Sequence, residues 1–275
     1  GNGSAWRALR TVTPLPIGER ASPQDKGNAM SVDAISLDAG TVPFDAQRHA
    51  RNYHYDFVTV IDDIVPASIH ADLRHRINAL VDAGAVALVD HAGKGTAAVS
   101  DLGGRYLHHI FLGDDVRAHL PEIATLYHAL LPLVSVITNQ DVVLSPHSRS
   151  DMNIKVYPPG GGTLGPHYDT NGITVLLFLT SNTEAPLRLQ VPRQHPSRAP
   201  WFEIREIHAR AGALLVMKGR EVLHDCAPTH NEQKITVVLN YYVRGDTWRH
   251  PGFDSFVYAR VAPQPLDEVH GARAG

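Results

Sequence analysis

Cysteine is almost absent from this chain of 275 residues, which contains a single one, Cys226. One cysteine cannot form a disulfide within the chain, so a small secreted domain held together by disulfides is excluded. A reducing compartment suits such a sequence best. We therefore expect a cytoplasmic protein that is stabilised by a packed core, with Cys226 as a small packed residue.

A surplus of basic residues is also lacking, because 25 Lys and Arg stand against 28 Asp and Glu, a formal net charge of −3. Binding to nucleic acid or to an anionic membrane surface depends on a basic patch. No apolar run approaches the roughly 20 residues that span a bilayer, and the N-terminus lacks the apolar core of a signal peptide. We therefore expect neither nucleic acid nor a membrane as a partner.

The composition that is present indicates a single catalytic domain with a helical first part. A hydrophobic content of 43% is ordinary for a globular protein. Residues 1–35 mix Gly, Pro and polar residues without an apolar period, and we treat them as an N-terminal arm or a remnant of expression. The remaining residues, 36–275, are predicted to form one domain with a helical part (36–141), a β-rich core (142–245) and a C-terminal tail (246–275).

Four segments of the helical part show a clear pattern. Residues 57–61 are predicted to form a buried strand, and residues 68–85 carry apolar side chains at helical spacing. Residues 121–138 are also predicted to be helical, in two pieces because Pro132 removes a backbone donor. Residues 103–109 begin with two glycines and are predicted to form a glycine-rich loop.

The part after Val142 consists of short apolar runs separated by Gly, Pro and Asn. Such runs are typical of β-strands, and a series of them after a helical part predicts a mainly β fold, a sandwich or barrel with flanking helices. The predicted strands cover residues 153–157, 173–179, 187–191, 201–207, 213–217 and 235–243.

A metal site is indicated by His167 and Asp169, which lie two residues apart and share one face if the backbone is extended. His224 follows the predicted strand 213–217 and supplies a third ligand. Two imidazoles and one carboxylate on one side of a metal leave positions open for a co-substrate and O2, as in non-haem Fe(II) oxygenases. The alternative is a surface turn with a hydrogen-bonded histidine, because His-x-Asp is common by chance.

An anion-binding site is indicated by Lys234, which begins the apolar stretch 235–243. Burial of a cation costs several kcal/mol unless the cation meets an anion, so we predict a carboxylate partner for it. Thr236 lies on the same face of the strand and adds a hydroxyl donor. The alternative is that Lys234 extends to water at the strand end, in which case Arg244 is the other candidate donor.

The ordered set of His-x-Asp, a second histidine and a lysine resembles the 2-oxoglutarate- and Fe(II)-dependent oxygenase superfamily. The resemblance covers residues 142–244, and residues 153–169 are similar to the prolyl-4-hydroxylase-like branch, which carries a tyrosine ahead of the His-x-Asp pair. Two features differ from the common pattern. Lys234 stands where most members have arginine, and the spacing from Tyr157 to His167 is one residue longer.

This resemblance implies a double-stranded β-helix, a jelly-roll barrel of the cupin type with iron near one mouth. It implies Fe(II), 2-oxoglutarate and O2 as cofactor and co-substrates, with hydroxylation of an unactivated C–H bond as the reaction. Halogenating relatives have a small residue in place of the metal carboxylate, so the resemblance argues against halogenation. The implied metal ligands are His167, Asp169 and His224, and the implied co-substrate residues are Lys234, Thr236 and Tyr157.

The substrate is expected to be a small molecule, an amino acid or a natural-product intermediate, because the chain is compact. Arg105, Tyr106 and Arg188 are predicted to contact it, and either arginine suits a carboxylate, although solvated arginines are the ordinary alternative. Two other functions remain open at this point. One is hydroxylation of a peptide or protein, and the other is a catalytically inactive jelly-roll protein that binds a metabolite or a metal.

Overall fold

The computed structural model describes residues 45–92, 105–161 and 165–246. The described residues all belong to one compact unit, Val32–Gly275. Its helices are α1 (Ala46–Asp56), α2 (Ala67–Asp82), α3 (Gly113–His119), α4 (Pro121–Ala129) and α5 (Leu131–Thr138). Its strands are β1 (Val58–Ile61), β2 (Ala87–Ala92), β3 (Arg105–Phe111), β4 (Val142–Leu144), β5 (Met152–Tyr157), β6 (Ile173–Phe178), β7 (Leu187–His195), β8 (Arg198–Ile207), β9 (Leu214–Met217), β10 (Leu223–Cys226) and β11 (Lys234–Val243).

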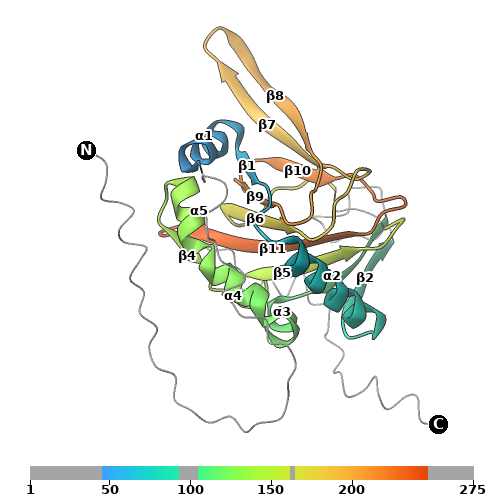
Figure 1. Cartoon of the computed structure of the whole chain (residues 1–275). Coiled ribbons are helices and arrows are strands. Elements are labelled where there is room, and N and C mark those ends of the chain that lie inside the picture. Colours follow the sequence, from blue (N-terminus) through green and yellow to red (C-terminus); the bar gives the residue numbers. More distant parts are fainter. Residues whose placement is uncertain (1–44, 93–104, 162–164, 247–275) are drawn as a thin grey trace, which may run out of the picture. The chain divides into compact units, whose positions relative to one another are not determined.

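The strands form two sheets, and every described strand pair is antiparallel. The larger sheet has eight strands in the order β1-β9-β6-β11-β5-β3-β2, with β4 also paired to β11, and the smaller sheet has the order β10-β7-β8. Figure 1 shows the smaller sheet above the larger one. The strand β11 is therefore central in the larger sheet, between β6 and β5.

The core between the two sheets is apolar. Alternate residues of β6 and β9 point from the larger sheet toward alternate residues of β7, because side chains of a strand leave its two faces in turn. This core makes the two sheets a sandwich with one shared interior. Its buried members are Val58, Leu176, Phe178, Leu187, Leu189, Val191, Ala209, Ala213, Leu215, Met217 and Val222.

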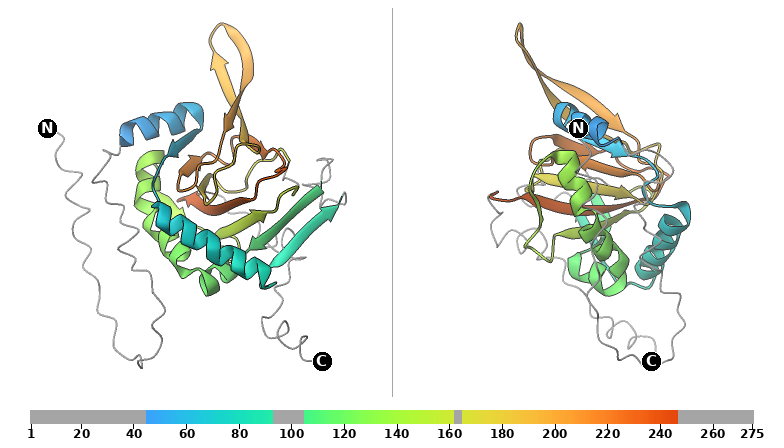
Figure 2. Two further views of the ribbon diagram at one scale, coloured as in Figure 1. Left: turned by 45° about the vertical axis from the view of Figure 1, so that its right-hand side comes forward. Right: turned by 60° about the vertical axis from the view of Figure 1, so that its left-hand side comes forward.

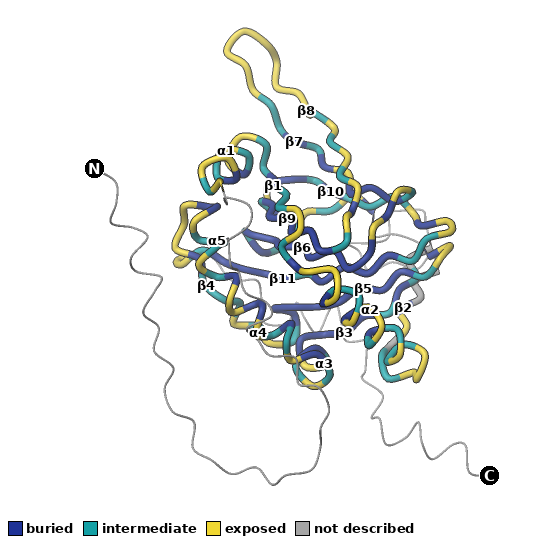
Figure 3. Tube along the Cα trace, in the orientation of Figure 1, coloured by how far each residue is buried: buried dark blue, intermediate teal, exposed yellow. Residues whose placement is uncertain are grey.

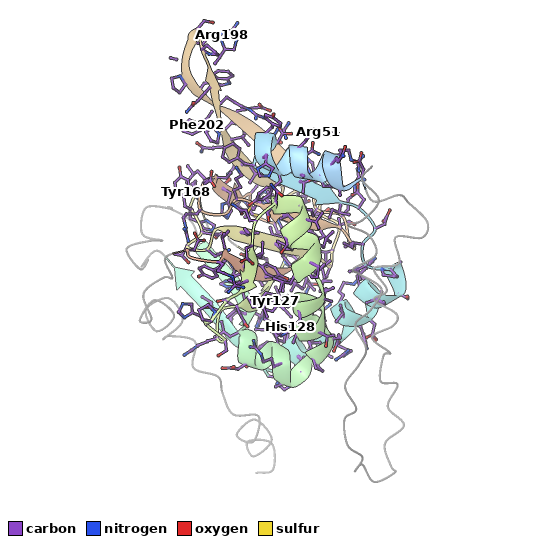
Figure 4. All side chains as sticks on the ribbon, turned by 90° about the vertical axis from the view of Figure 1, so that its left-hand side faces the viewer. Arg51, Tyr127, His128, Tyr168, Arg198 and Phe202 are labelled. Carbon is purple, nitrogen blue, oxygen red and sulfur yellow. The ribbon has the colours of Figure 1, made fainter. Side chains whose placement is uncertain are left out.

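Helices cover the other face of the larger sheet. Tyr127 of α4 packs on Tyr241 of β11 with ring centroids 4.7 Å apart, and the Tyr241 hydroxyl donates to the Tyr127 carbonyl at 2.6 Å. Figure 4 shows Tyr127 in this helix layer, beside the sheet. The strand β11 is consequently buried on both faces, which makes it a rigid base for side chains that point into the sandwich.

Helices α4 and α5 together form the most apolar helical segment, Pro121–Thr138, which by length and composition is apolar enough to cross a membrane. The segment is divided between Ala129 and Leu131, with proline in the first turn of α5. Leu130, Val134 and Ile137 have no exposed surface. These residues pack inside the molecule, and 39% of the segment is buried.

Most of the sequence-based expectations for the fold are confirmed. The mainly β architecture with flanking helices is present, and helix 121–138 is divided as predicted. The prediction of a loop over residues 103–109 is wrong for its described part, because Arg105–Phe111 forms β3, which pairs with β2 and β5. The alternation of buried and half-buried residues in this strand was not visible in the sequence. Two adjacent histidines, His108 and His109, lie one on each face of the strand, the first buried and the second half-buried. The predicted domain boundaries stay a prediction.

The strands β7 and β8 continue beyond the sandwich as a long hairpin (Figure 2). Figure 3 shows that burial decreases toward its tip, and Figure 4 places Arg198 at that tip and Phe202 lower on the same strand. Arg193 fixes the hairpin to the body, because its guanidinium donates to Asp56 of the α1 end at 2.9 Å and to Glu203 at 2.7 Å. The first residues of β7, Leu187–Gln190, pair with β10.

Candidate metal centre and cavity

The backbone holds His167, Asp169 and His224 together across a gap of more than fifty residues in sequence. His167 and His224 exchange two backbone hydrogen bonds, N–H to carbonyl, of 3.0 Å in each direction. The backbone N–H of Asp169 donates to the Gly219 carbonyl at 2.9 Å. The loop before β6 is thus joined to β10 and to the turn that precedes it.

The three side chains converge on one point. The Asp169 Oδ1 atom lies 3.6 Å from Nε2 of His167 and 3.6 Å from Nε2 of His224. One ligand atom of each residue lies within 4.8 Å of the others. The sequence-based expectation that these residues meet is therefore confirmed, and the alternative of a plain surface turn is wrong.

Both imidazoles are oriented by a backbone carbonyl. Nδ1 of His167 lies 2.8 Å from the Gly165 carbonyl, and Nδ1 of His224 lies 2.9 Å from the Val222 carbonyl. A carbonyl oxygen can only accept, so each Nδ1 carries a proton, and Nε2 is the ring atom that faces Asp169. This tautomer is the one that binds a metal through Nε2.

The protonation states also suit a metal. Burial, together with the neighbouring His224, lowers the pKa of His167 to about 4. Burial acts to raise the pKa of Asp169, but the two histidines and a hydrogen bond from Thr174 outweigh it, so this pKa lies below its usual value. Near neutral pH, His167 is neutral and Asp169 is ionised, so neither group must lose a proton before it binds a metal.

Asp169 is held by a short chain of hydrogen bonds through Thr174 and Asn171. The Thr174 hydroxyl donates to Asp169 Oδ2 at 2.5 Å and accepts from Nδ2 of Asn171 at 2.9 Å. Asn171 also donates to the Ile173 carbonyl at 2.6 Å. Oδ2 is therefore occupied and Oδ1 is the carboxylate oxygen that faces the histidines.

Replacement of Thr174 by valine is expected to lower metal affinity about 10- to 100-fold, the usual cost of losing the hydrogen-bond partner of a metal ligand. Valine keeps the shape of the side chain and removes only the donor to Asp169. Titration with Fe(II) or Co(II) under anaerobic conditions measures the effect, and Thr174→Ser should restore most of the affinity. Equal affinity in the valine variant and the parent would contradict this role.

Gly219 gives Asp169 the space it occupies. A Cβ atom at position 219 would lie 2.3 Å from the Thr174 hydroxyl oxygen and 2.6 Å from Asp169 Oδ2, both closer than real Cβ contacts. An alanine must therefore displace the Asp169–Thr174 pair. The requirement for glycine at this turn is steric.

Gly219→Ala is expected to reduce metal affinity at least as strongly as the loss of the Thr174 hydroxyl, about 100-fold, because it moves the ligand itself. Gly172→Ala is the matched control, since a Cβ there meets nothing closer than 3.1 Å, a side-chain oxygen of Asp246. The same metal titration compares the two variants. A metal affinity that falls equally in both would mean that the loop, and not contact with Asp169, is responsible.

A cavity opens beside the three side chains, with an empty space of about 600 Å³ when its open mouth is included. Its polar lining residues, apart from the three above, are Lys155, Tyr157, Thr174, Asp225, Cys226, Lys234 and Thr236. Its apolar lining residues are Leu176, Phe178, Leu187, Met217 and Val238.

Lys234 lies in this cavity and is only 3% exposed. Its Nζ donates to the Ala185 carbonyl and to Cys226 Sγ, each at 3.0 Å. The ion pairs found among the described residues include none with Lys234. The alternative that Lys234 extends to water is wrong, and its charge is buried without a carboxylate from the described part of the chain.

Thr236 and Tyr157 lie next to Lys234, as their predicted roles require. The Thr236 hydroxyl is buried and has no hydrogen-bond partner within the described ranges. Tyr157 is opposite Lys234 in the register of β5 and β11, and its ring stacks on His108 with centroids 5.4 Å apart. A buried cation and an orphaned hydroxyl side by side are two donors that an anionic group could accept from.

The other predicted contacts are placed differently. Arg188 donates to both oxygens of Asp225, at 2.9 and 2.5 Å, so its charge is already paired. Arg244, the second candidate anchor, pairs with Asp141 at 2.6 Å, is 70% exposed and is not part of the cavity lining. The side chains of Arg105 and Tyr106 lie outside the described residues, so their predicted substrate contacts stay predictions.

One cavity residue was missed although the sequence contained a signal for it. Lys155 precedes Tyr157 by two positions, and in a strand such residues share a face. The same argument that placed Lys234 and Thr236 on one face of their strand therefore also places Lys155 and Tyr157 on one face of β5. Thr174 and Gly219 carried no comparable signal, because their contacts with Asp169 depend on the folded loop.

No protein-family model and no curated protein sequence matches this chain. Solved structures do match, at low identity. The non-heme alpha ketoglutarate dependent carbocyclase SnoK from nogalamycin biosynthesis is 14% identical with a TM-score of 0.58, covering 80% of this chain and 94% of that chain. A Pseudomonas putida prolyl-4-hydroxylase is 14% identical with a TM-score of 0.51, covering 73% and 100%.

A third match is the epimerase SnoN in complex with Fe3+, alpha ketoglutarate and nogalamycin RO, 12% identical with a TM-score of 0.57, covering 77% of this chain and 88% of that chain. Alpha ketoglutarate is 2-oxoglutarate. These likenesses show that the chain has the jelly-roll fold of the 2-oxoglutarate/Fe(II) oxygenases, as the sequence predicted. The prolyl-4-hydroxylase-like branch is among the matching structures but is not singled out by them.

Proposed function

We propose that this protein is an Fe(II)- and 2-oxoglutarate-dependent oxygenase. The observation that carries the proposal is the convergence of two Nε2 atoms and one carboxylate oxygen in the lining of a cavity that also contains a buried lysine. Two imidazoles and one carboxylate are the facial ligand set of non-haem iron oxygenases. The structure of SnoN with iron and alpha ketoglutarate, on the same fold, supports this proposal.

The described residues fit both Fe(II) and 2-oxoglutarate. His167, Asp169 and His224 would hold Fe(II), with their donor atoms already oriented by carbonyls and by Thr174. Lys234 and the orphaned hydroxyl of Thr236 would bind the distal carboxylate of 2-oxoglutarate, and Tyr157 lies beside them. An anion there would satisfy a buried charge that otherwise costs several kcal/mol.

The metal and 2-oxoglutarate, when bound, supply the activation of O2, with conversion of 2-oxoglutarate to succinate and CO2. The protein contributes position and a dry environment. Asp169 and the two histidines keep their geometry because each is fixed by a hydrogen bond to its non-binding atom. Leu176, Phe178 and Met217 exclude water from the same space, which protects a reactive oxidant.

We infer that the reaction is hydroxylation of an unactivated C–H bond of a small molecule, an amino acid or a natural-product intermediate. The matching structures include the carbocyclase SnoK from nogalamycin biosynthesis, and this likeness supports a small substrate. The presence of Asp169 as a third protein ligand leaves no ligand position for a halide in its place, which speaks against halogenation. A cytoplasmic location remains our expectation from the single cysteine.

The test is anaerobic addition of Fe(II) and 2-oxoglutarate to the purified protein, followed by visible spectroscopy. A weak charge-transfer band that needs both additions is expected, and O2 should then yield succinate. Mass spectrometry of products from a screen of amino acids, related acids and proline-containing peptides distinguishes a small-molecule hydroxylase from a peptidyl hydroxylase. Absence of the band in folded, metal-loaded protein would instead favour a catalytically inactive binding protein.

A further inference from the structure

The hairpin strand β8 is an edge of the smaller sheet. It pairs with β7 on one side, because the sheet has the order β10-β7-β8. Within the described ranges, no backbone hydrogen bond uses its other side. At the opposite edge of this sheet, β10 is bridged to His167. The free side of β8 therefore presents a row of unpaired N–H and carbonyl groups along a strand of ten residues, and such a row can pair with a further strand.

Three large apolar side chains are exposed on this strand. Trp201 is 42% exposed, Phe202 60% and Ile204 59%. Figure 3 shows that the exposure extends along most of β8, and Figure 4 shows Phe202 on the projecting hairpin. Exposed apolar groups gathered in one place mark an interaction surface. Together with the free backbone edge, they indicate that the occupant of this edge is a β-strand with apolar side chains of its own.

Features that usually protect an edge strand lie near the tip of this hairpin. They are Pro200, which cannot donate a backbone hydrogen bond, and an irregular register just after Arg193. Residues 201–207, nearer the body, carry neither feature. Asp56 of α1 contacts Arg193 and Arg205, whose side chains share one face of the hairpin. The hairpin is thus anchored through a face, and the edge of residues 201–207 is not used by this anchor.

The sequence of β8 is complementary to itself when two copies run antiparallel with Ile204 opposite Ile204. In this register, Glu203 lies opposite Arg205 of the second copy, and Trp201 lies opposite Ile207 of the second copy. Each of these pairs occurs twice, because the arrangement has two-fold symmetry. Opposite charges across two strands stabilise the pairing and like charges destabilise it. A two-fold axis at Glu203 or at Arg205 would instead place two identical charges opposite each other.

We propose that this protein forms a two-fold symmetric dimer in which the β8 strands of two copies pair in antiparallel orientation. The two smaller sheets then become one sheet with the order β10-β7-β8-β8-β7-β10. A second copy is the occupant because the strand matches itself both in charge and in apolar character. An interface of two strands is small, so we expect a reversible dimer with a dissociation constant of about 1–100 μM. This dimer does not rest on the proposed function.

Sedimentation velocity of the full-length protein, from about 1 to 500 μM, measures this association. The average mass of the parent should rise with concentration toward twice the monomer mass. Ile204→Lys places two like charges opposite each other on the two-fold axis, so it should raise the dissociation constant about tenfold or more. Leu88→Lys is the matched control, because Leu88 is 53% exposed on β2, an edge strand of the larger sheet. This variant should dimerise as the parent does.

Disulfide crosslinking tests the register of the two strands. In the Ile204→Cys variant, the two thiols lie directly opposite each other, with about 5 Å between their Cβ atoms, and mild oxidation should join the chains. In the Phe202→Cys variant, each thiol lies opposite Glu206 of the second copy, so the two thiols are about 14 Å apart. That variant should not crosslink. The parent, which keeps Cys226, shows the background.

Three results would overturn the inference. A parent that remains monomeric at the highest concentration would exclude the dimer and leave the edge of β8 to a strand of another protein. Loss of the dimer in Leu88→Lys, with a normal dimer in Ile204→Lys, would place the contact on β2. Crosslinking of Phe202→Cys as readily as Ile204→Cys would contradict the antiparallel register. Thermal unfolding of each variant shows whether the fold is intact, which we expect because the replaced side chains are exposed.

Discussion

Replacement of His167 by alanine is expected to abolish the Fe(II)–2-oxoglutarate absorption band and the formation of succinate. His167 provides one of the three converging donor atoms, and loss of even a hydrogen-bond partner of a metal ligand costs 10- to 100-fold in affinity. Removal of the ligand itself should therefore lower Fe(II) affinity by more than about 100-fold. Anaerobic titration with Fe(II), followed at the band, measures this loss.

The variant is expected to fold, since the His167 side chain is 24% exposed and the backbone bonds to His224 do not require the imidazole. His208→Ala is the control, because His208 is exposed and lies outside the cavity lining. It should bind Fe(II) and 2-oxoglutarate as the parent does. If the His167 variant kept the band at parental Fe(II) concentrations, the metal would be held elsewhere and the proposed centre would be wrong.

Replacement of Lys234 by methionine is expected to raise the dissociation constant for 2-oxoglutarate roughly 100-fold while metal affinity is retained. Loss of one partner of a buried charged pair typically costs about 2–5 kcal/mol, and 1.4 kcal/mol corresponds to a factor of ten. Methionine fills a similar volume without the charge. Titration with 2-oxoglutarate of the metal-loaded parent and of the metal-loaded variant gives the dissociation constant for 2-oxoglutarate in each.

Thermal unfolding provides an independent measurement for the same variant. Without ligand, the free energy of unfolding should fall by no more than about 1 kcal/mol, because the lost contacts are with a carbonyl and a thiol while a buried charge is also removed. At 100 times the parental dissociation constant, 2-oxoglutarate should stabilise the loaded parent by about 2.7 kcal/mol and the variant far less.

Arg244→Met separates the two candidate anchors. Arg244 is exposed and paired with Asp141, so its replacement should leave the affinity for 2-oxoglutarate unchanged. If Arg244→Met weakened binding and Lys234→Met did not, the co-substrate would be held outside the described cavity. The buried Lys234 opposite Tyr157 would then bind a ligand other than 2-oxoglutarate.

The strands of the sandwich could be predicted because their side chains face an apolar interior. The predicted boundaries of β5, β6, β9 and β11 agree with the observed ones at one end and differ by a single residue at the other. The hairpin β7–β8 was predicted too short, since its outer part has polar and exposed residues on both faces and lacks the alternation that burial imposes. Short strands such as β4 and β10 offer too few residues for any period to be visible.

The metal ligands could be predicted because their chemistry is restrictive and because His167 and Asp169 are close in sequence. The residues that contact those ligands could not be predicted. Thr174 and Gly219 matter only through contacts with Asp169 that arise when the loop before β6 folds onto the turn before β10. Nothing in the residue types themselves distinguishes this threonine or this glycine from the others in the chain.

The sequence by itself determined the class of fold, the identity of the three converging ligands and the presence of a lysine that must meet an anion, since periodicity and the cost of burying charge are local properties. The tertiary structure decided which cations share the cavity. It buried Lys234 and brought Lys155 beside it, while it paired Arg188 with Asp225 and left Arg244 at the surface. Such choices depend on strand register and on contacts between distant segments, which a linear pattern does not contain.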